Sequence, residues 1–183
     1  MVSEMGINMK IAVVTGASSG LGREFAKQIA ARYSRFDEIW LGARRTERLE
    51  EVAAEIKLTS RVISLDLSST DELSQFKGLL EENTPDIKLL VNCAGYGRSG
   101  SFEELDCDEQ LGMVDVNCRA LTAVTKLCLP YISQNSRIIE LASAAGFMPQ
   151  PDFAVYAATK AYVLSFSKAL NKELKSRKIT VTA

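Results

Sequence analysis

Residues 10–22 read KIAVVTGASSGLG, and this stretch decides the fold of the chain. Its first half is an apolar, mostly β-branched run that predicts a buried strand ending just before the first glycine. Gly16, Gly20 and Gly22 then allow a tight turn and a close approach of the backbone to a ligand. An amphipathic helix begins at about Leu21, so its N-terminal amides point toward an anion. A strand, a glycine-rich turn and a helix in this order are typical of a dinucleotide-binding site.

Strands and helices alternate along the rest of the chain, without a linker or repeat. Further strands are predicted at 37–42, 61–65, 87–92, 136–142 and 178–183, and helices at 21–33, 46–57, 70–82, 106–130 and 155–176. Alternation at this rhythm requires a parallel sheet, because a helical crossover must bring each strand back. The predicted fold class is α/β, a doubly wound parallel sheet with the strand order 3-2-1-4-5-6.

Composition excludes several classes of function. The 183 residues are 46% apolar, and their net charge of −1 argues against a nucleic-acid surface. No apolar run is long enough to span a bilayer, and no signal peptide is recognisable, so we expect no membrane partner. Histidine is absent and the four cysteines form no C-x-x-C pair, so we predict no metal site and a reducing, cytoplasmic location. Residues 1–9 are expected to be an N-terminal extension of a single domain over 10–183.

A tyrosine and a lysine four residues apart, Tyr156 and Lys160, share one face of the last predicted helix. An adjacent ammonium favours a phenolate, which makes a tyrosine a usable acid or base near neutral pH. Ser143 lies thirteen residues ahead of Tyr156, and its hydroxyl is suited to hydrogen-bond a carbonyl oxygen. Taken alone, the tyrosine–lysine spacing is that of an ordinary helix, and Ser143 is an ordinary turn residue.

The glycine pattern T-G-x-x-x-G-x-G at 15–22, together with Tyr-x-x-x-Lys and an upstream serine, resembles the short-chain dehydrogenase/reductase family. The resemblance covers essentially the whole chain and implies a Rossmann-like fold. It implies that Tyr156 is the catalytic acid or base, that Lys160 tunes it and anchors the cofactor ribose, and that Ser143 binds the carbonyl. It also implies that Asn117 holds a water that hydrogen-bonds the lysine. The cofactor contacts it implies at the turn are Gly16, Ser18, Ser19, Gly20, Leu21 and Gly22.

Cofactor preference is predicted from the end of the second strand. An enzyme that uses NAD usually carries an acid there, but this chain has Ala43 followed by Arg44 and Arg45. A guanidinium matches a 2′-phosphate in charge and geometry, so we favour NADP as the cofactor. The alternative is that both arginines form the solvated start of the next helix.

Further cofactor contacts are expected at the ends of the third and fourth strands. By resemblance, Asp66 and the neighbouring Leu67 contact the adenine, although Asp66 can also be a helix cap. Asn92, Ala94 and Gly95 belong to a segment that resembles the Asn-Asn-Ala-Gly of the family, with Cys93 in place of its second asparagine. We expect this segment to be partly structural and partly a cofactor contact.

Asn117 stands inside the predicted helix 106–130, where asparagine is a poor helix former. A kink or a bound water is therefore expected, and a solvent-facing asparagine is the alternative. Both long helices carry apolar residues on more than one face, which favours a homodimer or homotetramer, as does the resemblance.

Family members continue beyond the sixth strand, so by resemblance this chain lacks the usual last strand and the segment that covers the substrate. We therefore expect NADP binding with slow turnover, and the substrate cannot be identified from the sequence. The predicted function is an NADP-dependent oxidoreductase acting on a small-molecule carbonyl or alcohol. The alternative is a non-catalytic dinucleotide-binding module, which would need no acid and base.

Overall fold

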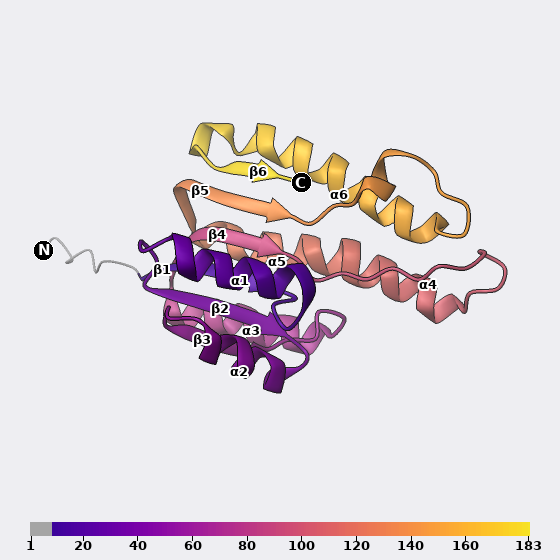
Figure 1. The fold of residues 1–183 in the computed structure, drawn as a ribbon. Helices are drawn as coiled ribbons and strands as arrows, with labels where there is room; N and C mark the ends of the chain where they lie inside the picture. The colour runs from indigo at the N-terminus through magenta and orange to yellow at the C-terminus, as the bar shows by residue number, and fades with distance from the viewer. Residues whose placement is uncertain (1–8) are drawn as a thin grey trace, which may run out of the picture.

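Six parallel strands form one sheet in the order β3-β2-β1-β4-β5-β6 (Figure 1). The computed structural model describes residues 9–183, so most of the extension predicted at 1–9 lies outside the described residues. The predicted doubly wound topology is confirmed. The strands are β1 (Lys10–Thr15), β2 (Glu38–Ala43), β3 (Ser60–Ser64), β4 (Asp86–Asn92), β5 (Ile132–Glu140) and β6 (Thr180–Thr182).

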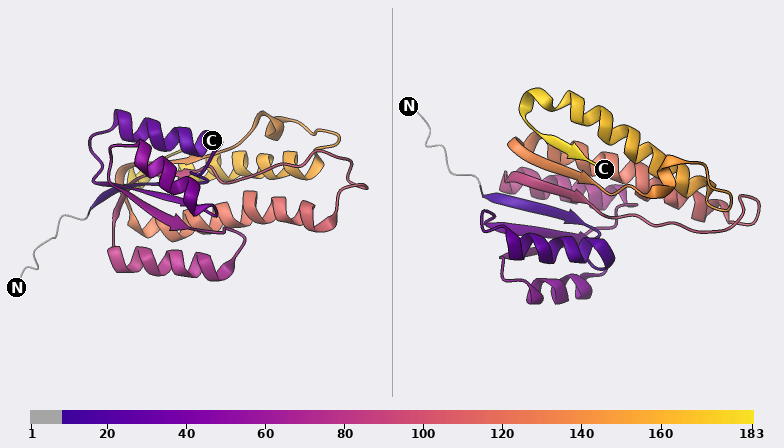
Figure 2. Two further views of the ribbon diagram at one scale, coloured as in Figure 1. Left: turned by 60° about the horizontal axis from the view of Figure 1, so that its bottom comes forward. Right: turned by 45° about the horizontal axis from the view of Figure 1, so that its top comes forward.

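Helices cover both faces of the sheet (Figure 2). One apolar cluster lies between the sheet and α1 and α2, and a second lies between the sheet and α3, α5 and α6. Covered on both faces, the central strands are almost continuously apolar, as the sequence predicted. The helices are α1 (Gly20–Arg32), α2 (Thr46–Glu55), α3 (Thr70–Asn83), α4 (Cys107–Val114), α5 (Leu121–Cys128) and α6 (Ala154–Glu173).

The largest difference from the predicted elements is in β5, which begins at Ile132 instead of residue 136. Ile132 pairs with Ile87 of β4, but the register shifts before the next pairs. Asn135 adopts a φ of 61°, in the left-handed region that interrupts a regular strand. This irregularity breaks the apolar alternation, which is why the first half of the strand could not be recognised from sequence.

The helix predicted over 106–130 is interrupted in its middle. A π-helical segment, Asp115–Ala120, separates α4 from α5 and contains Asn117. A π-helical turn holds about one residue more than an α-helical turn, and such turns are frequent at functional sites. The helix therefore departs from regular α-helical geometry at Asn117, a position where asparagine is a poor helix former.

The strand order reverses between β1 and β4, and this position determines where a ligand can bind. In such sheets the crevice lies beyond the carboxyl ends of the strands at the reversal. α4 and the N-terminal half of α6 extend past this edge of the sheet (Figure 2). Within residues 9–183, no helix combines the length and the apolar character needed to cross a membrane.

Candidate active site

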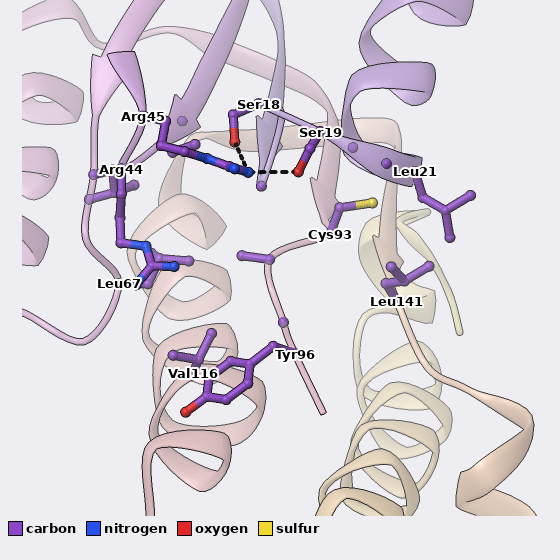
Figure 3. A pocket seen from close by; sticks show the side chains of 18 of the residues that line it. Ser18, Ser19, Leu21, Arg44, Arg45, Leu67, Cys93, Tyr96, Val116 and Leu141 are labelled. Atoms are coloured by element: carbon purple, nitrogen blue, oxygen red, sulfur yellow. Dashed lines mark hydrogen bonds between the residues drawn. The ribbon is translucent and has the colours of Figure 1, made fainter. Parts of the chain in front are cut away.

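A cleft of about 340 Å³ lies at the carboxyl ends of β1, β2 and β4 (Figure 3). It occupies the position expected for a dinucleotide in a doubly wound sheet. Most of the predicted cofactor contacts line it: Gly16, Ser18, Ser19, Gly20, Leu21, Gly22, Arg44, Arg45, Asp66, Leu67, Ala94 and Gly95.

The glycine turn brings backbone close to backbone at the floor of the cleft. Gly16 has a φ of 67°, and a Cβ added to it would lie 2.8 Å from the Cα of Ala94. A Cβ on Gly22 would overlap the carbonyl oxygen of Gly16. Side chains at these positions would therefore displace the turn from β4, so the glycines keep the cleft open down to the backbone.

Two arginines stand at the rim, and they differ in their contacts. Arg45 donates hydrogen bonds to the hydroxyls of Ser19, at 2.9 Å, and Ser18, at 3.3 Å (Figure 3). These two hydrogen bonds hold Arg45 over the glycine turn. Arg45 also directly precedes α2, as the alternative for the two arginines expected. Arg44 is close enough to Asp66 for its charge to act on that carboxyl.

Asp66 closes the turn after β3. One oxygen of its carboxylate accepts hydrogen bonds from the backbone N–H and the hydroxyl of Ser68. The hydroxyl of Ser68, its backbone N–H and the charge of Arg44 lower the pKa of Asp66. The N-cap of α3 is Ser69, which accepts from the N–H of Glu72. Asp66 is therefore free of the capping role that sequence left open, and it is one of the residues that line the cleft.

Asn92 is placed differently from its neighbours at the end of β4. Its side chain is buried and donates to Thr125 and Glu140, both at 3.0 Å. Cys93, Ala94 and Gly95 line the cleft, whereas Asn92 is not among the lining residues. Of the two roles expected for this segment, Asn92 carries the structural one.

Tyr156 and Lys160 lie one turn apart near the start of α6. Lys160 is 4% exposed, and its Nζ donates a 2.7 Å hydrogen bond to the carbonyl of Leu141. The same nitrogen lies 5.8 Å from the centroid of the Tyr156 ring. Burial lowers the pKa of Lys160. The structure therefore places a desolvated amine beside a half-buried phenol.

Asn117 is fully buried, and its side chain clamps the segment after β4. Its Oδ1 accepts from the N–H of Tyr96, and its Nδ2 donates to the carbonyl of Tyr96 at 2.8 Å and to the hydroxyl of Thr159 at 3.1 Å. A Cβ on Gly95 would lie 2.8 Å from Asn117 Oδ1 and 3.4 Å from Lys160 Nζ. Asn117 and Lys160 are thus brought together beside Gly95, which lines the cleft, although neither they nor Tyr156 are among the lining residues. The solvent-facing alternative for Asn117 is wrong.

Ser143 follows β5 and caps the short 3₁₀ helix Ala144–Phe147, accepting from the N–H of Ala145. A hydroxyl that accepts in this way keeps its proton for another partner. Within residues 9–183, no hydrogen bond joins Ser143 to Tyr156.

Three contributors were not predicted from sequence. The carbonyl of Leu141 holds Lys160, and backbone roles leave no signal in residue type. Thr159 donates to the carbonyl of Tyr156 and accepts from Asn117, and a polar residue between the tyrosine and the lysine was a usable signal. Glu140 is a charged residue in an otherwise apolar run, which was a signal as well.

Comparison with known proteins gives the family. The short chain dehydrogenase family model matches residues 10–183. An uncharacterized oxidoreductase of Staphylococcus epidermidis is 33% identical over 97% of this chain and 76% of its own length. The very-long-chain 3-oxoacyl-CoA reductase of Neurospora crassa is 34% identical over 93% of this chain and 53% of its own length.

Solved structures agree with this result. The bulky-bulky ketone specific alcohol dehydrogenase from Comamonas testosteroni superposes with a TM-score of 0.85 at 33% identity, covering 96% of this chain and 72% of that one. A short-chain dehydrogenase from Sphingobium yanoikuyae in complex with NADPH gives 0.86 at 31% identity, with coverage of 96% and 70%. Sequence and fold lead to one conclusion: the chain belongs to the short-chain dehydrogenase/reductase family.

Proposed function

We propose that this chain is an NADP(H)-dependent oxidoreductase that transfers a hydride between the nicotinamide and a small-molecule carbonyl or alcohol. The observation that carries the proposal is the buried Lys160 beside Tyr156, with its Nζ close to Gly95 of the cleft lining. Dinucleotide binding alone requires no acid or base, whereas a desolvated amine beside a phenol is suited to proton transfer.

The residues of the cleft fit NADP. The turn at Gly16 and Gly22 leaves room for a pyrophosphate against the backbone, as in other dinucleotide-binding folds. Arg45 lies over this turn and Arg44 lies near Asp66, and these two guanidiniums would hold a 2′-phosphate. Asp66 supplies a carboxylate acceptor for an adenine amino group. The cofactor, when bound, supplies or accepts the hydride.

The proton chemistry then falls to the chain itself. Tyr156 donates a proton to the carbonyl oxygen in reduction and removes it in oxidation. The ammonium of Lys160 stabilises the phenolate form, and the hydroxyl of Ser143 donates to the charge that develops on the substrate oxygen. Asn117 fixes Tyr96 and with it the loop that borders Tyr156.

Carbonyl compounds are the expected substrate class. The names of two relatives describe enzymes of bulky ketones and of 3-oxoacyl thioesters, and both groups react through a ketone. A test should therefore include ketones, aldehydes and 3-oxoacyl thioesters, with oxidation of NADPH as the readout. The non-catalytic alternative predicts cofactor binding without turnover of any compound.

Tyr156→Phe is the matched control for this assay, because it removes only the hydroxyl. It should lower kcat by at least about 10²-fold, the contribution of a general acid, and leave NADPH affinity nearly unchanged. Turnover at the same rate in both proteins would show that Tyr156 does not transfer the proton.

A further inference from the structure

Glu140 occupies an unusual position for a carboxyl group. It is the last residue of β5 and is 0% exposed. It pairs in register with Asn92 of β4, and the side chains of both reach Thr125 of α5. Polar groups this deeply buried are costly unless every one of them is hydrogen-bonded.

The hydrogen bonds of this cluster show how many protons it holds. Asn92 Nδ2 lies 3.0 Å from both Thr125 Oγ1 and Glu140 Oε2. Thr125 Oγ1 lies 2.8 Å from both the carbonyl of Leu121 and Glu140 Oε1. These four contacts require four protons; the amide provides two and the hydroxyl provides one. Each contact has a proton of its own only if Glu140 carries the fourth and donates it to Thr125, whereas an ionised Glu140 leaves the Thr125 hydroxyl to share one proton between Leu121 and Glu140.

Within residues 9–183, no lysine or arginine forms an ion pair with Glu140. Among the described residues, the titratable neighbour on α5 is Cys128, whose thiol pKa is raised by its own burial. From α6, the ammonium of Lys160 reaches the carbonyl of Leu141 and not the carboxyl of Glu140. Burial raises the pKa of Glu140 to about 7, against the opposing effect of Thr125 and Asn92.

The cluster connects directly to the catalytic lysine. The N–H of Leu141 donates to the carbonyl of Asn92 at 3.0 Å, and the carbonyl of Leu141 accepts from Lys160 at 2.7 Å. We propose that Glu140 is held as a neutral carboxylic acid and acts as a positioning residue for Lys160 through Leu141, so that loss of its proton weakens both fold and catalysis. The catalytic part of this inference rests on the proposed function, whereas the part on stability does not.

Glu140→Gln tests the inference, because a glutamine can donate to Thr125 and accept from Asn92 as the neutral acid does. Unfolding midpoints are measured without cofactor from pH 5 to pH 9. The folded pKa of about 7 lies above the 4.5 of an ordinary glutamate, so the folded protein holds the extra proton between these values. Wild-type stability should therefore fall across this window and level off above it. We expect its midpoint to drop by on the order of 10 °C relative to the variant.

Two further variants separate specific from general effects. Glu38→Gln, at another buried carboxylate that contacts Arg61, should lower the midpoint about equally at every pH. Thr125→Val should move the pH transition, because it removes the hydroxyl that is hydrogen-bonded to Glu140 Oε1. This second variant keeps the test valid if Glu140→Gln does not fold. A constant difference between wild type and Glu140→Gln, or an unshifted transition in Thr125→Val, would overturn the neutral acid.

The positioning role is tested by the pH profile of kcat, measured well below the unfolding temperature. The ratio of wild-type to Glu140→Gln kcat should be near one at pH 6 and fall severalfold above pH 7. A ratio that stays constant while the stability difference changes with pH would leave Glu140 a structural residue only and refute the positioning role. If neither protein reduces any carbonyl compound, the proposed function fails, while the unfolding experiment still decides the protonation of Glu140.

Discussion

Gly97→Ala is the substitution with the most direct effect expected on Tyr156. A Cβ on Gly97 would lie 2.7 Å from Cδ2 and 2.9 Å from Cε2 of the Tyr156 ring. Carbon atoms pack best at about 3.5–4.0 Å, so the two groups must separate by roughly 1 Å. Phe153 packs edge-on against the same ring, with the centroids 4.9 Å apart. A Cβ on Gly146 would lie only 2.7 Å from the backbone of Lys160 in α6. Because α6 is packed this closely against Gly146, the helix has little room to move.

The expected cost follows from this displacement. A reacting group misplaced by about 1 Å can lose on the order of 10²-fold in rate. We therefore expect kcat to fall by about 10²-fold in Gly97→Ala. The affinity for NADPH should change little, because Gly97 is not among the residues that line the cofactor cleft.

The assay is steady-state reduction of the best carbonyl substrate, together with a fluorescence titration of NADPH. Gly78→Ala is the matched control, because a Cβ at Gly78 in α3 would meet nothing within 4 Å. It should leave kcat unchanged and raise stability by roughly 0.5–1 kcal/mol, the helix preference of alanine over glycine. An unchanged kcat in Gly97→Ala would refute the argument that Tyr156 depends on this contact.

Three other predictions concern the cofactor, the thiols and association. Arg44→Ala with Arg45→Ala should weaken NADP binding by about 1.5–3 kcal/mol for each charge-assisted bond lost, measured by nicotinamide fluorescence; equal losses for NAD would refute 2′-phosphate recognition. Iodoacetamide at pH 8 should label the exposed Cys107 first, as read by mass spectrometry, whereas burial raises the pKa of Cys93 to about 11 and protects it. Leu111 and Val114 of α4 are exposed, and we expect them to pack in a homodimer or homotetramer; a single-chain mass at micromolar concentration in sedimentation would contradict this.

The fold could be predicted from sequence because its main signals are local. Buried parallel strands must be apolar, and the glycine turn needs glycine for steric reasons that no other residue satisfies. The start of β5 escaped prediction because the left-handed Asn135 interrupts its pattern. The last strand was predicted to begin at residue 178, but β6 begins only at Thr180. The reason is similar, because Lys178 has a φ of 53°, which interrupts an extended strand.

The candidate site could be predicted only where residue type reports chemistry. Tyr156 and Lys160 were recognisable by their spacing together with the glycine turn and the upstream Ser143, and the structure places the tyrosine and the lysine together. The hydrogen bonds between Asn117 and Tyr96 could not be predicted. They join two segments 21 residues apart, and one of these segments is π-helical. Sequence indicated that Asn117 is unusual in a helix but not which atoms it binds.

The alternation of side chains along a strand explains why the cleft lining and the buried polar cluster of Glu140 meet at the ends of β4 and β5. Cys93 and Leu141 line the cleft, whereas the residues before them, Asn92 and Glu140, point to the opposite face and reach α5. The hydrogen bond from the N–H of Leu141 to the carbonyl of Asn92 joins the two layers. A substitution at Cys93 should therefore change the cofactor wall and leave the polar cluster intact. A substitution at Asn92 should affect Lys160 from the face of the sheet opposite the cleft, because it removes a hydrogen-bond partner of Glu140 and leaves the cleft lining unchanged.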